Sequence, residues 1–200
     1  LGGDPVSENT IAKLAGLSGD LPEWATLLFN RLLQNPGFRD GFIQRSAAYL
    51  NTIFQPAVTV GTVDSLQNLL QTQMPRHIGR WHSPPSMQAW QGNIDLVRNF
   101  LENRPAYYRQ HLTDLFGKQD SALVSMQIVG QGKVLLSGVA FSQNMQGYFF
   151  KNADIVLQAV PAPGHRFVAW QGIGGAGENA GLTPTGDTAF TAIFTPVAGI

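Results

Sequence analysis

The hydrophobic periodicity of the chain changes at Gly117. Before this residue, apolar side chains recur three or four positions apart, as on one face of an α-helix. From Ser121 onward, apolar and polar residues alternate in short runs separated by glycine turns, which is typical of strands with one buried face. The change predicts an α+β chain in which an all-α array of about five helices precedes a small all-β antiparallel sandwich or curled sheet.

We expect three segments along the chain. Residues 1–21 are rich in glycine and turn-forming residues and predict a leading loop with about one helical turn. Residues 22–117 form the helical subdomain, and residues 118–200 form the β module. Both parts are long enough to bury a core, the second more marginally.

Prolines set most of the expected helix boundaries. Pro22 and Pro36 each begin a helix, the first with Asp20 as its cap. An extended link at Gln55–Gly61 precedes a third helix, which Pro75 kinks because its ring blocks a backbone hydrogen bond. The remaining expected boundaries are a break at Ser83-Pro84-Pro85, a helix end at Arg104-Pro105 and a C-terminal stop at Gly117.

One helix has the clearest amphipathic pattern of the chain. Its apolar residues follow one another at alternating spacings of three and four, which places them on a single helix face. The stripe predicts the central buried helix of the array, packed on the faces of two earlier helices. Its members are Met87, Trp90, Ile94, Val97 and Leu101.

Aromatic residues supply the expected core of the β module. Phe167 and Trp170 are its best anchors, because large rings dominate the burial of small cores. Their expected partners are Tyr148, Phe149 and Phe190. The same aromatic residues also suit an exposed strip that stacks on sugars.

Composition excludes several classes of partner and site. Thirteen basic and thirteen acidic residues cancel, with nine of each up to Gly117 and four of each after it, so the basic patch of a nucleic-acid binder is missing. No apolar run approaches the roughly 20 residues needed to span a bilayer. Cysteine is absent, which rules out disulfides and thiolate metal sites.

Two motifs resemble ligand sites but favour a structural role. Gly172–Gly177 spells G-x-G-x-x-G, yet no helix pattern follows it as a nucleotide-binding turn requires, so we expect a hairpin loop. His77 and His82 are five residues apart, whereas two histidines that bind one metal from a helix are three or four apart. We expect this segment to pack through cation–π or ion-pair contacts of its arginines and Trp81.

The arginines of the first two helices also favour structural contacts. Arg31, Arg39 and Arg45 are threaded through apolar sequence, with Asp40 and Asp114 as candidate partners. The chain contains no serine elbow and no paired metal-binding motif. We therefore predict no catalytic, cofactor-binding or metal-binding residue in this chain.

The amino-acid sequence of the helical part resembles one known family. Three blocks carry the resemblance: LLFNRLLQNPGFRDGFIQR at 27–45, TVDSLQNLLQTQMPRHIGRW at 62–81 and WQGNIDLVRNFLENRPAYYRQHL at 90–112. Together they are similar to the C-terminal helical part of the CotH kinase family, the spore-coat protein H-like proteins. The resemblance extends from Trp24 to Phe116.

The resemblance implies an atypical protein kinase that binds ATP and a divalent metal. The catalytic aspartates of that family lie in a W-D-x-D-like segment, N-terminal to the matching blocks, and no such motif is present here. Asp4 is therefore not assigned a catalytic role. We expect the chain to be a piece of a longer exported protein, inactive alone, whose partner is the missing N-terminal kinase lobe of the same polypeptide.

The β module resembles the bacterial surface repeats related to the internalin B-repeat. The resemblance rests on GQGKV at 130–134, GYF at 147–149, PAPGHRFVAW at 161–170 and TAIF at 191–194. Such modules imply a secreted or cell-surface protein of bacteria. The alternative function is a binding or adhesion module for carbohydrate or cell-surface components, without a kinase role.

One further expectation concerns apolar side chains near the N-terminus. If a kinase lobe covers part of the helical array, its removal leaves apolar residues facing water. The candidates are Leu14, Leu17, Leu21 and Trp24. They would be covered by a refolded N-terminal segment or by a second copy, unless the helical part is self-contained.

Overall fold

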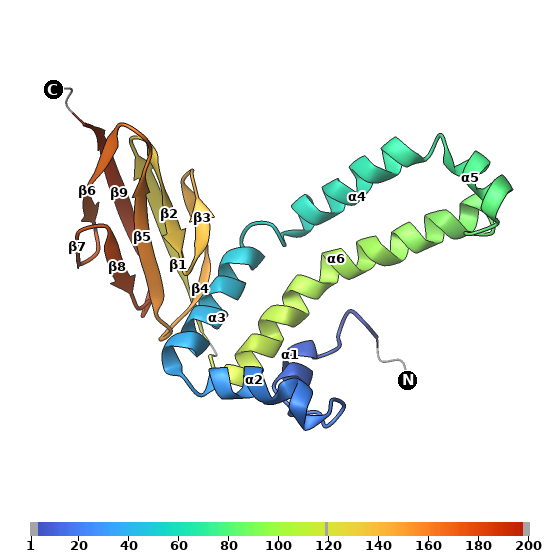
Figure 1. Ribbon diagram of the computed structural model, residues 1–200, viewed down its shortest axis with the longest axis horizontal. Helices are drawn as coiled ribbons and strands as arrows, with labels where there is room; N and C mark the ends of the chain where they lie inside the picture. The colour runs from blue at the N-terminus through green and yellow to red at the C-terminus, as the bar shows by residue number, and fades with distance from the viewer. Residues whose placement is uncertain (1–3, 119, 198–200) are drawn as a thin grey trace. The chain divides into compact units, whose positions relative to one another are not determined.

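The computed structural model describes residues 4–118 and 120–197. Helices come first along the chain and strands follow, which confirms the predicted α+β class (Figure 1). The helices are α1 (Thr10–Leu14), α2 (Glu23–Leu33), α3 (Pro36–Leu50), α4 (Pro56–Leu70), α5 (Met74–Trp81) and α6 (Met87–Phe116). The strands are β1 (Ser121–Val129), β2 (Gly132–Leu136), β3 (Val139–Phe141), β4 (Met145–Phe150), β5 (Ile155–Pro161), β6 (His165–Gln171), β7 (Gly175–Ala176), β8 (Asn179–Leu182) and β9 (Thr188–Pro196).

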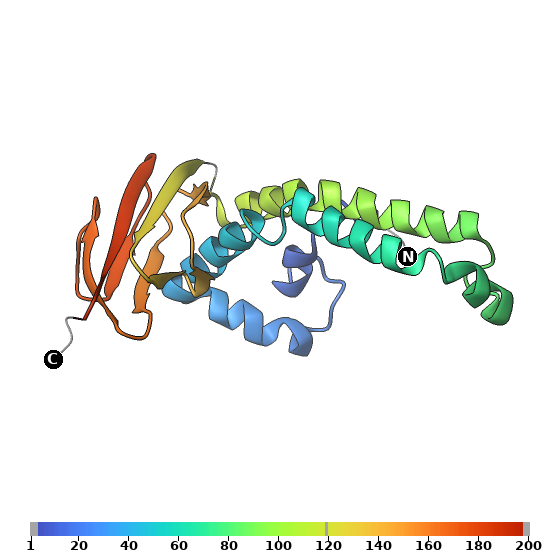
Figure 2. The same cartoon turned by 90° about the horizontal axis from the view of Figure 1, so that it is seen from above.

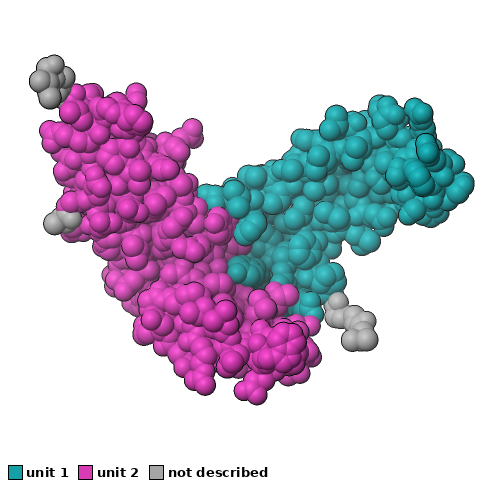
Figure 3. Space-filling view, viewed as in Figure 1, with its two compact units in different colours: residues 1–9, 52–110 teal, residues 10–51, 111–200 magenta. Residues whose placement is uncertain are grey.

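The chain divides into two compact units that do not follow the change of period (Figure 3). The hairpin unit comprises residues 1–9 and 52–110. The sandwich unit comprises residues 10–51 and 111–200, so α1, α2, α3 and the last turns of α6 belong with the strands. The boundary between helices and strands therefore differs from the boundaries between the two compact units.

In the hairpin unit, α4 and α6 lie side by side and run in opposite directions, and α5 lies at the turn between them (Figures 1 and 2). The expected extended link at Gln55–Gly61 is wrong, because α4 already begins at Pro56. Pro75 likewise occupies the first turn of α5 and does not kink a longer helix. Proline suits this position because the first turn has no intrahelical partner for its missing N–H.

The expected helix end at Arg104-Pro105 is also wrong. Helix α6 continues from Met87 to Phe116 with Pro105 inside it. A proline there removes one backbone hydrogen bond, which is compatible with a continuous helix when side-chain packing on both sides supports it. The predicted stop at Gly117 is confirmed by its φ of 63°, a left-handed conformation that suits glycine.

The predicted central buried helix is not found. No residue between 52 and 110 is buried, and Met87 and Val97 of the stripe are 40% and 47% exposed. Two paired helices can turn only one narrow face toward each other, so part of a wide apolar stripe stays in water. The amphipathic pattern predicted the helix correctly and its burial wrongly.

The sandwich unit contains two sheets. One has the strand order β4-β1-β9-β6 and the other β3-β2-β5-β8-β7. The pairs are antiparallel except for β1 with β9, which run parallel with Val124 opposite Thr188. Strand β1 is therefore central in its sheet, between β4 and the last strand of the chain.

The predicted alternation fills the space between the two sheets. Val124, Val134 and Leu157 are fully buried, and Trp170 and Phe190 are 8% and 3% exposed. The Phe167 ring lies 4.9 Å from Trp170 and 5.6 Å from Phe194, centroid to centroid. These contacts confirm Phe167 and Trp170 as anchors of the core.

Tyr148 corrects the predicted set of core partners. It is 57% exposed, whereas its neighbour Phe149 is fully buried. The two side chains follow each other on β4 and therefore point to opposite faces of the sheet. The GYF motif thus contributes one core ring and one surface ring.

A close backbone approach explains the glycines of the GQGKV motif. A Cβ on Gly130 would lie 2.1 Å from the Phe194 carbonyl oxygen, and one on Gly132 would lie 2.6 Å from the Phe194 ring. Gly130 also has a φ of 86°. The turn from β1 to β2 can therefore approach Phe194 this closely only without a Cβ at these two positions.

The expected exposure of apolar residues near the N-terminus is confirmed. Leu14, Leu17 and Trp24 are 50%, 64% and 80% exposed, and Leu21 is 39% exposed. Asp20 does not cap α2, which begins at Glu23 after Pro22 without a side-chain cap. Its carboxylate instead lies 3.4 Å from Lys13 Nζ.

Candidate functional site

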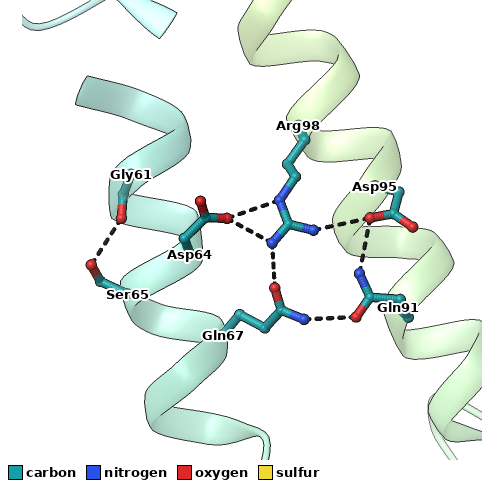
Figure 4. Close-up of polar contacts among 7 residues, drawn as sticks. All are labelled: Gly61, Asp64, Ser65, Gln67, Gln91, Asp95 and Arg98. Atoms are coloured by element: carbon teal, nitrogen blue, oxygen red, sulfur yellow. Dashed lines mark hydrogen bonds and ion pairs between the residues drawn. The ribbon is translucent and has the colours of Figure 1, made fainter. Parts of the chain in front are cut away.

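A cluster of polar side chains joins α4 to α6 in the hairpin unit (Figure 4). Arg98 on α6 donates from Nε and Nη2 to one carboxylate oxygen of Asp64 on α4, at 2.9 and 2.6 Å. It also donates from Nη1 to Asp95, at 3.0 Å, and from Nη2 to Gln67. Gln67 in turn donates to Gln91 of α6 at 2.6 Å. The guanidinium thus has partners on both helices.

This cluster is a structural clasp. The hydrogen bond that Arg98 donates to Asp64, followed by the negative charge of Asp64 and the hydrogen bond and charge of Asp95, holds the pKa of Arg98 above its ordinary value. Asp64 and Asp95 each accept from the same guanidinium, whose single positive charge compensates one of their two negative charges. Arg109, further along α6, has its pKa lowered by burial. Both arginines stay charged at neutral pH, because arginine titrates far above it.

In the sandwich unit, Gln44 of α3 joins the helix to the sheet. Its amide donates to the carbonyl oxygens of Phe150 and Ala153, at 2.7 and 2.8 Å, and accepts from the Phe150 N–H at 3.1 Å. The side chain is fully buried. Asn51 adds a bond of 2.9 Å to the Tyr148 carbonyl. Sequence reasoning missed Gln44, since nothing in a helix pattern marks which polar residue will face strand ends.

Arg45 makes the third contact between α3 and the strands. Its Nε donates to the Ser137 carbonyl oxygen at 2.7 Å, in the turn between β2 and β3. Ser137 and Gly138 of this turn have φ angles of 47° and 86°. A Cβ on Gly138 would lie 2.5 Å from Arg45 Nη2, so the guanidinium rests directly on the glycine. Arg45 therefore does not pair with an acid, unlike Arg39, whose Nε lies 3.6 Å from Asp40.

An open cleft of about 480 Å³ lies beside Arg45. One wall is the first half of α3 and the other is the surface of β2, β5 and the β2–β3 turn. The Ser137 hydroxyl in this wall is buried and has no hydrogen-bond partner among the described residues. Such a group costs about 1–3 kcal/mol. The lining residues are Gly37, Phe38, Gly41, Phe42, Arg45, Leu135, Ser137, Gly138, Val156 and Gln158.

The motifs that resemble ligand sites have structural positions. Gly172–Gly177 contains β7, in which Gly175 pairs with Ala180 of β8, and no helix follows in the residues described up to 197. His77 Nε2 lies 3.0 Å from the Ser83 carbonyl oxygen, and His82 ends α5 in a left-handed conformation. The expected cation–π contact is present, with Arg80 4.9 Å from the Trp81 ring.

Two features that a nucleotide–metal site uses are not found among the described residues. No three histidine or acidic side chains in residues 4–118 and 120–197 converge as a metal would require. The glycine loop lacks the helix N-terminus that holds a phosphate. Among the same residues, no helix combines the length and apolarity needed to cross a membrane.

Comparison with known proteins gives one finding. Residues 7–108 match the family model described as CotH kinase protein, which is just over half of the 200 residues. The match begins before α1 and ends within α6, so it covers the helices and stops before the strands. No curated protein and no solved structure matches the chain.

Proposed function

Because the chain belongs to the CotH kinase protein family, we propose that it is the helical scaffold and β accessory module of an exported CotH-like protein, without catalysis of its own. The phosphoryl-transfer site would then lie in an N-terminal lobe of the same polypeptide. The internalin-like character of the β module belongs to this proposal.

The proposal rests on the hydrogen bonds and ion pairs that the acidic side chains make within the chain. Asp64 and Asp95 bind Arg98, and Asp40 accepts from the Asp154 N–H at 3.3 Å. Asp4 accepts from the Val6 N–H at 3.1 Å and from the Ser7 hydroxyl. Phosphoryl transfer needs carboxylates free to hold a metal beside the phosphates. These carboxylates instead accept hydrogen bonds from neighbouring groups of the chain.

A titration of the intact chain with ATP and Mg²⁺ tests the absence of catalysis. We expect no binding tighter than about 100 µM by calorimetry and no transfer of labelled phosphate to the chain or to added protein. Tighter binding, or transfer above that of a heat-denatured sample, would contradict the proposal. The sequence encoded before Leu1 tests the second part, since a W-D-x-D-like motif is expected there.

A further inference from the structure

We propose that the cleft between α3 and the β2–β3 turn binds a monocarboxylate with an apolar body. The inference is independent of the proposed function and concerns the sandwich unit alone. The cleft volume, about 480 Å³, lies within the range of small-molecule sites.

Arg45 supplies the recognition of the carboxylate. Its Nε is fixed by the 2.7 Å bond to Ser137, and Gly138 supports the plane of the guanidinium. Among the described residues, neither terminal NH₂ group has a hydrogen-bond partner or an acid within ion-pair distance. An arginine held by Nε presents its terminal nitrogens as a fork, which matches the two oxygens of a carboxylate.

The remaining lining explains the apolar body. Phe38 and Phe42 line the cleft from α3, and Leu135 and Val156 line it from the sheet. Val156 is 62% exposed, although a valine of this kind gains from burial. No other charged residue lines the cleft, so its single positive charge suits one carboxylate better than a doubly charged phosphate.

Ser137 provides the second polar observation. Its residue is 5% exposed and its hydroxyl has no partner in the described structure, in the β2–β3 turn whose carbonyl oxygen accepts from Arg45. A hydroxyl buried in this way is unfavourable unless a ligand or a neighbour accepts its hydrogen bond. A carboxylate bound at the Arg45 fork would bring such an acceptor to this wall.

The test uses 4-phenylbutyrate as probe and the neutral 4-phenylbutyramide as its matched control. Binding to the intact, ¹⁵N-labelled chain is followed by shifts of the amides that line the cleft. We expect a dissociation constant on the order of 1 mM for the acid and binding at least about tenfold weaker for the amide. Equal binding of acid and amide, or no shifts at the cleft, would overturn the proposal.

Two variants and one control locate the site. R45Q should weaken acid binding by about tenfold or more, and Arg166→Gln, an exposed arginine on β6, should leave it unchanged. Gly41→Leu should narrow the cleft, because Gly41 lines it and a Cβ at this position meets nothing within 4 Å. If R45Q fails to fold, the Gly41→Leu variant and the comparison of acid and amide on the native chain still test whether the cleft binds a carboxylate.

Phenyl phosphate distinguishes the other anion that arginine recognises. We expect it to bind more weakly than 4-phenylbutyrate at equal concentration. Tighter binding of the phosphate ester would overturn the assignment to a carboxylate. Undiminished binding to the Gly41→Leu variant would show that the acid binds elsewhere and would overturn the assignment to this cleft.

Discussion

The hairpin unit and the sandwich unit differ in how completely they bury their apolar side chains. In the sandwich unit, side chains such as Phe149, Phe150 and Leu157 are almost completely removed from water. In residues 52–110 of the hairpin unit no side chain is buried, and α4 and α6 are joined by the polar clasp around Arg98. A sheet pair encloses a layer of side chains, whereas two helices share only a line of contact. The sandwich unit therefore encloses a core, whereas the paired helices of the hairpin unit leave much of their apolar surface exposed.

The largest expected effect is in the core of the sandwich unit. Phe149→Ala should lower the free energy of unfolding by about 3–5 kcal/mol, because it removes a fully buried ring and leaves a cavity. Chemical denaturation followed by tryptophan fluorescence measures the loss. Tyr148→Ala, one residue earlier and 57% exposed, is the matched control and should cost far less. Equal losses would show that the two faces of β4 are not distinguished.

The next effect tests how α3 is held to the sheet. Gln44→Leu should cost about 2–3 kcal/mol, because the Phe150 N–H and the carbonyls of Phe150 and Ala153 lose their partner while they stay buried. Gln127→Leu, at an exposed position of β1, serves as control and should change stability by less than about 0.5 kcal/mol. A Gln44 variant as stable as the control would show that water replaces the amide.

A smaller effect is expected at the best amphipathic stripe of the hairpin unit. Trp90→Ala should cost less than about 2 kcal/mol, since its neighbours on the stripe stay partly in water and Trp90 itself is only half-buried. This revises the larger loss that its place in the sequence pattern predicts. Thermal melting of the variant beside Phe149→Ala measures the difference. A loss as large as that of Phe149→Ala would erase the contrast between the units.

The smallest effect concerns the clasp between α4 and α6. Arg98→Gln should raise amide hydrogen exchange in α4 by less than about tenfold, because partly exposed ion pairs contribute little. Raised salt should weaken the contribution of the native pair and narrow the difference between the two proteins. Exchange in β1 and β9 serves as the internal control and should not change. Faster exchange there as well would show that the clasp stabilises the whole chain.

Local sequence patterns predicted most of the helices and strands, but they did not predict which of these elements pack against one another. The period of two identified the buried residues of β1 and β2, and a glycine turn does connect these two strands at 130–132. Proline signals were correct at Pro36, where Asn35 caps the helix, and wrong at Pro105, where the helix continues. The short strands β3, β7 and β8 carry too few residues for a period to be recognised.

The candidate cleft was beyond sequence reasoning for a related reason. Arg45 is one of several arginines in the helical part, and acidic partners were the natural expectation. Its actual partner is a backbone carbonyl 92 residues later, in the β2–β3 turn. Two residues of this turn have left-handed backbone conformations, which no local sequence pattern predicted. Which arginine remains free of an acid depends on contacts between distant segments.

Sequence patterns alone were sufficient for the class of secondary structure on each side of Gly117, the family of the helical part and the turns that require glycine. Those properties follow from local periodicity and from backbone sterics. The tertiary structure decided that α3 belongs with the strands, that the best amphipathic helix stays partly exposed, and that Arg45 faces a cleft. Burial depends on how many surfaces surround a side chain, and a one-dimensional pattern specifies which face is apolar but not what covers it.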